Sequence, residues 1–354
     1  MSKLNVALLY NLKQNAPHRD DEPWDAWNEL ENERTAASIE RALRIGGHEV
    51  LAMEGDATLP QKLARYKIDL AFNFCEGHYG VSREAQVPAI LDMLRIPYTG
   101  AGVLTLALAL DKPMAKRVMM FHGLPTPGFQ TFITGEERID SKLKYPLFVK
   151  PSREGSGIGI TKNSVCRNAR ELREQVQYII QSYHQPAIVE EYIQGREFTV
   201  GMLGNMPWNV GKPSKNGHRK PFEIPSTLRV FPPLEVDLSP VPQEEGGLYT
   251  SVVKSKLYDV PKYLFPAPIS KSLRTKMERY SAGAFAALEC CDFARVDFRV
   301  DKETGQLYIL EINPLAGLQE GISDIVMAAE ADGIDYVSLI NGILDAARQR
   351  FGMI

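Results

Sequence analysis

Residues 145–159 read YPLFVKPSREGSGIG, and this stretch decides the fold. Its apolar first half is typical of a strand, and Lys150 at the end of that strand can reach a phosphate as a point charge. The glycines let backbone N–H groups turn inward around phosphate oxygens. The order of residues is not that of a P-loop, G-x-x-x-x-G-K-[S/T]. A tight turn between two strands would use similar glycines, so the residues downstream decide between the two interpretations.

Composition and charge exclude several classes of protein. A chain of 354 residues should form two or three compact units. Its formal net charge of −3 argues against nucleic acid as the main partner. No apolar run approaches the roughly 20 residues that span a bilayer. The N-terminus, MSKLNVALLYN, lacks the long apolar region of a signal peptide. We therefore expect a cytoplasmic protein whose partners include neither a membrane nor nucleic acid.

The cysteines give no sign of a metal or redox site. Cys75, Cys166, Cys290 and Cys291 form no C-x-x-C pair, and the last two lie in the apolar segment AALECCDFARVDF. We interpret all four as small buried or half-buried apolar residues.

The first hundred residues alternate between strand and helix patterns. The predicted elements are strands at 5–10, 48–52 and 68–73 and helices at about 31–44 and 85–94. This alternation predicts a parallel sheet with its ligands at the carboxyl ends of the strands. We expect residues 1–102 to form this N-terminal α/β domain.

Two further units are predicted, a central one at 103–192 and a C-terminal one at 193–354. Their elements should include helices at 104–123 and 169–182 and strands at 147–150, 159–161 and 187–190. Residues 211–247 are rich in proline and charge, and the stretch is long for a structureless loop in a compact domain. Such loops are usually lids or binding segments.

Three polar residues near the C-terminus stand among apolar ones. Asp297 lies in ARVDFRV, while Glu311 and Asn313 lie in YILEINP. If these two segments pair as a hairpin, the three side chains come together, and the spacing of Glu311 and Asn313 puts both on one face. Carboxylate and amide oxygens suit Mg²⁺. A solvated strand face followed by an Asn-Pro turn is the alternative, but it leaves the apolar flanks of the acidic residues unexplained.

In order and spacing these segments resemble the ATP-grasp superfamily, and within it the D-alanine–D-alanine ligases. The matching segments are YTGAGVLTLALALDK (98–112), FVKPSREGSGIGI (148–160), VEEYIQGREFTV (189–200) and ARVDFRVDKETGQLYILEINPLAGL (294–318). The resemblance covers nearly the whole chain. It implies an α/β (α+β) ATP-grasp fold of three subdomains, with nucleotide between the central and C-terminal ones, and it suggests a homodimer.

The resemblance also implies the roles of individual residues. For the nucleotide and metal, these are Lys112 and Lys150 on the phosphates, Glu190 on the adenine amino group, Glu197 on the ribose, and Asp297, Glu311 and Asn313 on Mg²⁺ (or Mn²⁺). For the reaction, these are Arg295 and the backbone N–H of Gly317 facing the oxyanion, Ser156 positioning substrate and lid, and His78 near the first substrate. A lid at about 247–257 would contain Lys254.

Departures from the family pattern lie on the substrate side. The N-terminal motif whose Glu holds the first substrate's ammonium is absent, and Asn28 falls near that position with Glu29 and Glu31 beside it. In the lid, Lys254 is kept but the Tyr that should follow it is Ser255. The Ser-Leu pair expected after Gly317 is replaced near 322–323, and residues 211–247 form an expansion before the lid.

These features predict an ATP- and Mg²⁺-dependent carboxylate–amine ligase. Phosphoryl transfer would activate a carboxylate as an acyl phosphate, which an amine of a second amino-acid-like substrate then attacks. A genuine D-alanine–D-alanine ligase of peptidoglycan synthesis is the alternative. A non-catalytic ATP-binding module is a third hypothesis, but ATP binding alone would not require an arginine that faces an oxyanion.

Overall fold

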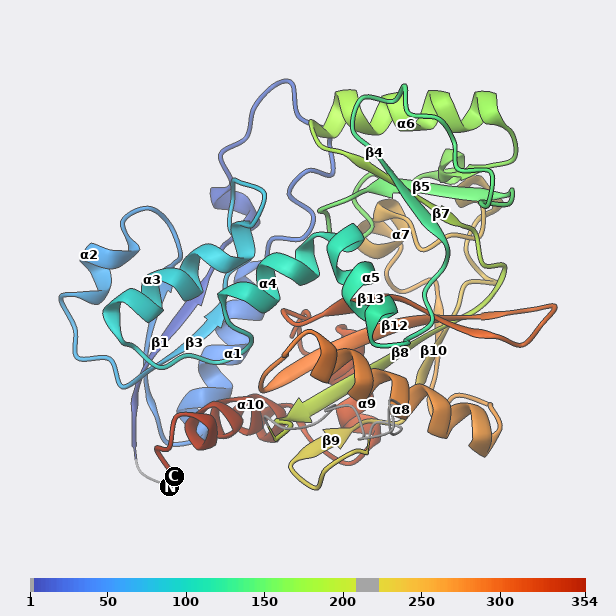
Figure 1. Ribbon diagram of the computed structural model, residues 1–354. Coiled ribbons are helices and arrows are strands. Elements are labelled where there is room, and N and C mark those ends of the chain that lie inside the picture. Colours follow the sequence, from blue (N-terminus) through green and yellow to red (C-terminus); the bar gives the residue numbers. More distant parts are fainter. Residues whose placement is uncertain (1–2, 208–222) are drawn as a thin grey trace.

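The computed structural model describes residues 3–207 and 223–354, which form three β-sheets with helices packed against them (Figure 1). Each sheet lies within one of the three segments for which a separate subdomain is expected. The boundaries between the subdomains stay a prediction.

The N-terminal sheet is parallel, as the alternating pattern predicts. It has the order β2-β1-β3 and consists of β1 (Asn5–Tyr10), β2 (Glu49–Glu54) and β3 (Leu70–Phe74). All five residues of β3 are buried, because helices cover both faces of the sheet. The covering helices are α1 (Glu33–Ile45) on one face and α2 (Leu59–Leu63) and α3 (Gln86–Leu94) on the other.

The central sheet is antiparallel and carries the glycine-rich loop. Its order is β4-β7-β5-β6, from β4 (Phe129–Phe132), β5 (Leu147–Pro151), β6 (Val165–Cys166) and β7 (Ala187–Glu191). Helix α6 (Ala169–Tyr183) covers one face, where Leu172, Val176 and Ile179 pack on the sheet (Figure 1). The strand predicted at 187–190 is confirmed as β7.

Two predicted elements of this region are wrong. No strand forms at 159–161, because Gly157 and Gly159 have φ of 72° and 75°, and the chain turns instead of extending. The helix predicted at 104–123 is two helices, α4 (Val103–Leu110) and α5 (Lys112–Phe121). Asp111 between them has extended backbone, and its carboxylate accepts the Met114 N–H at 3.1 Å, which caps α5.

The largest sheet has the order β11-β10-β8-β12-β13, with β9 paired to β8. Its strands are β8 (Gly195–Gly204), β9 (Leu228–Val230), β10 (Leu234–Asp237), β11 (Lys262–Leu264), β12 (Phe293–Asp301) and β13 (Leu307–Asn313). Residues 211–222 of the expected long loop lie outside the described residues. The remainder, 223–247, contains β9 and β10.

The C-terminal helices join the first and last parts of the chain. These are α9 (Asp324–Ala331) and α10 (Tyr336–Arg350), whereas α8 (Lys271–Ala287) packs in the core of the largest sheet. Ile39 and Leu43 of α1 share one buried core with Leu339 and Ile343 of α10, and α1 lies beside α10 in Figure 1. The N-terminal sheet is therefore held against the C-terminal unit by a common core.

Two expectations from composition concern membranes and cysteines. Across 3–207 and 223–354, the structure has no helix with the length and apolar character needed to cross a membrane. All four thiols are free; Cys75, Cys166 and Cys290 are buried and Cys291 is half-buried, as predicted.

Candidate active site

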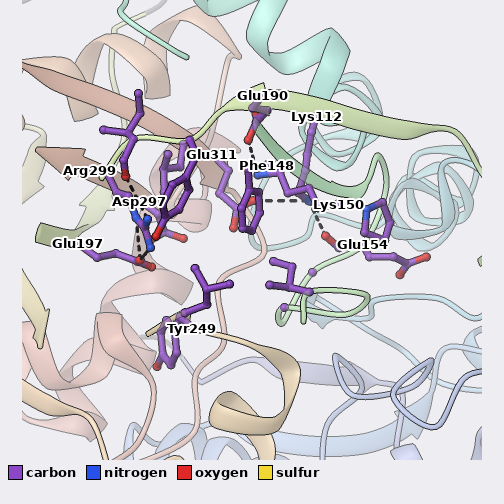
Figure 2. A pocket seen from close by; sticks show the side chains of 18 of the residues that line it. Lys112, Phe148, Lys150, Glu154, Glu190, Glu197, Tyr249, Asp297, Arg299 and Glu311 are labelled. Atoms are coloured by element: carbon purple, nitrogen blue, oxygen red, sulfur yellow. Dashed lines mark hydrogen bonds and ion pairs between the residues drawn. The ribbon is translucent and has the colours of Figure 1, made fainter. Parts of the chain in front are cut away.

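Two adjoining cavities lie where the sheets meet. The inter-sheet cleft is lined by β5 and β7 on one side and by β8, β12 and β13 on the other, and Figure 2 shows its side chains converging. The polar cavity, of about 460 Å³, is bounded by the loop before α1, the glycine-rich loop and residues 313–324. Lys112, Lys254 and Glu311 line both cavities, so the two meet at these residues.

Lysines from two elements surround one carboxylate at the back of the cleft. Glu190 of β7 lies 2.7 Å from Lys116 Nζ and 3.1 Å from Lys150 Nζ. Burial favours the neutral carboxyl, but the two ammonium groups outweigh it and lower the pKa of Glu190. Burial also lowers the pKa of Lys116, which Glu190 counters only in part. The predicted adenine-binding Glu190 is thus a buried counter-ion of Lys150 in this structure.

The glycine-rich loop is tethered at two of its backbone N–H groups. Glu29 accepts the N–H of Gly155 at 3.1 Å, and Asp25 accepts that of Gly159 at 3.1 Å. Both acceptors come from the loop before α1. Ser156 has φ of 48°, a left-handed conformation that costs free energy in a residue other than glycine and is common at ligand sites.

The predicted lid packs directly on this loop. It contains a short helix, α7 (Ser251–Lys256), capped by Thr250. A Cβ on Gly157 would lie 3.0 Å from the Ser251 nitrogen, so only glycine fits this approach. Asn28 Nδ2 donates to Ser251 Oγ at 2.8 Å, so the loop before α1 contacts both the glycine-rich loop and the lid.

Strand β12 carries three charged residues at alternate positions, which places them on one face. Arg295 donates two hydrogen bonds of 2.9 Å to Asp297, and Asn313 Nδ2 donates a third at 3.0 Å. Arg299 donates to Glu197 at 2.7 and 3.1 Å. Asp297 is paired with Glu311 across β12 and β13, beside a register shift, and irregularities of this kind are common next to active sites.

Glu311 is held ionised by the cations around it. Its carboxylate is 3.5 Å from Lys112 Nζ. Burial raises the pKa of this group, yet the charges of Lys112, Lys150, Lys254 and Arg295 outweigh burial and bring the pKa well below its usual range. A buried carboxylate that stays charged among lysines can share them with the oxygens of a phosphate or with a metal ion.

Four expected reaction residues meet at the polar cavity. Arg295, Ser156, Lys254 and Gly317 all line it, although they come from four separate segments. The Arg295 guanidinium also lies 3.7 Å from Asp324 at the start of α9. Lys254 Nζ lies 4.5 Å above the ring of Tyr249, which places an aromatic ring next to the lysine despite Ser255. A cation and a backbone N–H on one wall could stabilise a developing oxyanion.

The three expected substrate residues are not placed alike. Glu29 and Glu31 line the polar cavity. His78 lines neither cavity, because its ring packs edge-on against Trp27 with ring centroids 5.9 Å apart. Glu76, two residues earlier, lines the polar cavity instead.

Several charged residues of the site were not predicted from the sequence. Arg299 could have been found, because it continues the alternation of Arg295 and Asp297. Lys116 follows Lys112 by one helical turn. Arg83 and Glu84 gave no signal, since only the fold brings the turn before α3 against the glycine-rich loop. Arg83 Nη1 donates to the backbone oxygen of Arg153 at 2.9 Å.

Comparison with known proteins identifies the family. A model described as D-ala D-ala ligase C-terminus matches residues 118–222 and 237–345. The chain belongs to the D-alanine–D-alanine ligase family. It is an ATP-dependent carbon–nitrogen ligase related to D-alanine–D-alanine ligase, and its α/β architecture is the ATP-grasp fold that the sequence resemblance implied.

Related proteins and structures extend this assignment. The chain is 37% identical to the uncharacterized protein y4sG of Sinorhizobium fredii over 90% of this chain and 88% of that one. It is 33% identical to a D-alanine–D-alanine ligase of Syntrophotalea carbinolica, over 90% and 91% of the two chains. The fold is similar to that of a D-alanine–D-alanine ligase from Bacillus anthracis complexed with ATP, with a TM-score of 0.71, 18% identity and 99% of each chain covered.

Proposed function

We propose that this ligase binds ATP in the inter-sheet cleft and joins an amino acid, or a similar small acid, to an amine in the polar cavity. The γ-phosphoryl group passes to the acid's carboxylate and releases ADP. The amine then attacks the carbonyl carbon of the acyl phosphate and expels phosphate, leaving an amide bond. The observation that carries this proposal is the meeting of the two cavities at Lys112, Lys254 and Glu311.

Cations at this meeting point support phosphoryl transfer. Lys112 and Lys150 can neutralise the phosphates, which would otherwise repel the attacking carboxylate. Figure 2 shows both lysines on the wall of the cleft with Glu197 and Arg299 farther along it, where the ribose would lie. We assign Glu190 the task of holding Lys150 and Lys116 in place beside the nucleotide. Arg295, with the N–H of Gly317, would face the oxyanion of the tetrahedral intermediate.

The donor atoms where the two cavities meet fit a magnesium ion. Asp297, Glu311 and Asn313 offer carboxylate and amide oxygens, which hard cations prefer, and Glu311 is kept ionised. Asp297 is saturated by Arg295, Thr199 and Asn313, and no group of three His, Cys, Asp or Glu residues in the described ranges is close enough to hold a metal alone. Mg²⁺ (or Mn²⁺) would therefore be held jointly by these residues and the phosphates, whose charge it would neutralise.

D-alanine–D-alanine ligation is the second candidate, because several relatives carry that name at about 30% identity. The loop before α1 argues against it. Asn28 lies where the family's ammonium-binding Glu is expected, and it is engaged by Ser251 of the lid. A site built to hydrogen-bond a substrate group loses orders of magnitude when the partner is missing.

A screen of ADP release tests the proposal. The protein is incubated with ATP, Mg²⁺ and D- or L-amino acids and small peptides, and products are identified by mass. Amino-acid-dependent ADP release with an amide product is expected, and Arg295→Ala serves as the inactive control. Release of ADP without any amide product would refute the ligase assignment. A kcat/KM for D-alanine of roughly 10⁴ M⁻¹s⁻¹ or above would favour the second candidate.

We also propose a cytoplasmic homodimer associated through the N-terminal unit. Family resemblance suggests this assembly, and Met93 and Leu94 at the end of α3 are 84% and 41% exposed. Sedimentation of the wild type and of Met93→Glu tests it, because a charged residue at a shared apolar contact should yield monomers.

A further inference from the structure

Three carboxylates line the end of the polar cavity that faces the N-terminal sheet. They are Glu31 before α1, Glu76 after β3, and Glu84 in the turn before α3. We call this cluster the carboxylate pocket. It lies on the same cavity as Arg295 and Gly317, so a substrate bound in the pocket can extend toward the proposed reaction centre.

Two of the cations near this pocket, Arg83 and Lys112, are paired with other carboxylates. Arg83 donates to Glu29 through Nε at 2.8 Å and lies 3.1 Å from Glu154. Lys112 is paired with Glu311 and donates to the backbone oxygen of Glu154. Among the described residues, Glu76 and Glu84 have no hydrogen bond or ion pair with any side chain. Glu84 is nevertheless only 9% exposed.

Burial of unpaired carboxylates is costly unless a ligand compensates it. Burial, followed by the charge of neighbouring carboxylates, raises the pKa of Glu76 well above its usual range. Burial also raises the pKa of Glu84 and of Glu31 to about 7. Arg83 limits the rise at Glu84 and Glu76 but does not cancel it. The nearby cations that the structure describes therefore compensate the carboxylates of Glu76 and Glu84 only in part.

A metal ion is not the expected ligand of these carboxylates. No three acidic, histidine or cysteine residues in the described parts of the chain are grouped closely enough to bind one ion. Separate carboxylates that line one cavity, one of them buried and two half-buried, suit ammonium groups, each of which donates three hydrogen bonds. A lone α-ammonium carries one positive charge, while Glu76 and Glu84 alone can carry two negative charges.

We propose that the carboxylate pocket binds a substrate with two ammonium groups, a basic amino acid or a diamine, with Glu76 and Glu84 as its specificity-determining residues. This substrate class rests on the proposed ligase function. The size of the polar cavity agrees with a substrate longer than alanine.

Matched substrates test the proposal. Ornithine and lysine, in D and L forms, are compared with norleucine, which has a similar length but no side-chain ammonium. For the wild type, kcat/KM measured by ADP release should be on the order of 100-fold higher for the basic substrate, the scale of one buried charge pair. Equal values for lysine and norleucine would overturn the assignment of a basic substrate.

Substitutions in the carboxylate pocket test whether Glu76 and Glu84 cause the preference for basic substrates. Glu84→Gln and Glu76→Gln should each raise KM for the basic substrate by a similar factor, with little change in kcat, whereas only one of the two should raise KM for norleucine, whose single ammonium pairs with one carboxylate. Glu33→Gln, at an exposed position outside both cavities, is the matched control. If both pocket variants kept the wild-type ratio of kcat/KM for basic over neutral substrates, the carboxylate pocket would not be the site that recognises the second ammonium group.

Binding is measured separately from turnover. Lysine or 1,4-diaminobutane should raise the melting temperature of the wild-type protein more than norleucine does, and Glu84→Gln should lose this difference. If no substrate causes ADP release, the proposed ligase function is refuted, but the shift in melting temperature still tests whether the pocket binds a second ammonium group. If norleucine and lysine act alike in both assays, the pocket proposal fails while the ligase function stands.

Discussion

Removing the charge of Glu190 should destabilise the protein strongly, and in a way that depends on pH. Glu190→Gln keeps the side chain's size but leaves Lys116 and Lys150 without their shared counter-ion. The side chain of Lys116 is 1% exposed and that of Lys150 is 8% exposed, so water cannot replace the carboxylate. Breaking a buried ion pair from one side typically costs about 3–5 kcal/mol.

Deprotonation of a lysine limits this cost. From the ordinary lysine pKa of 10.5, releasing the proton at pH 7.5 costs about 4 kcal/mol, at 1.36 kcal/mol per pH unit. Lys116 is the lysine that should lose its proton, because burial already lowers its pKa, whereas the carboxylates around Lys150 outweigh burial and raise the pKa of Lys150. In the variant its pKa falls in the folded state only, so the folded protein binds fewer protons and gains stability as pH rises. The loss should therefore shrink to about 1–2 kcal/mol at pH 9.5.

Urea unfolding of the variant and wild type at pH 7.5 and 9.5 measures both effects. Glu191→Gln is the control, because this neighbour is half-buried and, among the described residues, its carboxylate accepts just one hydrogen bond, from the Lys144 N–H at 3.3 Å. A loss below 1 kcal/mol at pH 7.5 would refute the buried-pair argument. A loss that is the same at both pH values would refute the role of lysine deprotonation.

Further predictions concern turnover and motion. Arg295→Ala should lower kcat by about 100-fold or more with nearly unchanged ATP binding, measured by ADP release and calorimetry, because one oxyanion donor is lost. Glu311→Gln should abolish turnover in a folded protein, and activity at saturating Mg²⁺ would contradict its metal role. Lys150→Ala should weaken ATP binding or slow phosphoryl transfer, and unchanged values for both would remove it from the phosphate site. Hydrogen exchange across residues 247–257 should slow when an ATP analogue and substrate bind together; unchanged protection would argue against a lid.

Local pattern was sufficient for much of the fold. Apolar runs predicted β1, β3, β5 and β7 because buried strands need continuous or alternating apolar residues. The pattern was insufficient at Asp111, where a carboxylate caps the second helix and interrupts an apparently continuous one. It was also insufficient at 159–161, where left-handed glycines turn the chain away from an extended path.

Sequence patterns likewise predicted some residues of the site and missed others. Alternation within one strand placed Glu311 and Asn313 on one face, because residues two apart share a face wherever the strand lies. The expected pairing of two apolar segments into a hairpin added Asp297. Alternation could not identify Glu84 or Arg83, whose neighbours in space are distant in sequence. His78 was chosen by its position in a motif, whereas the turn of the chain directs Glu76 into the cavity.

The sequence by itself determined the family, the alternation of strands and helices in the N-terminal unit, and the chemical types available for phosphate and metal. Those depend on local patterns and short motifs, which need no knowledge of distant contacts. Only the tertiary structure decided that Glu190 is a counter-ion for two lysines, that Asn28 contacts the lid, and that Glu76 and Glu84 lie unpaired in one cavity. The reason is that the charge state and partner of a buried group depend on what packs against it, and packing joins residues whose separation along the chain carries no signal.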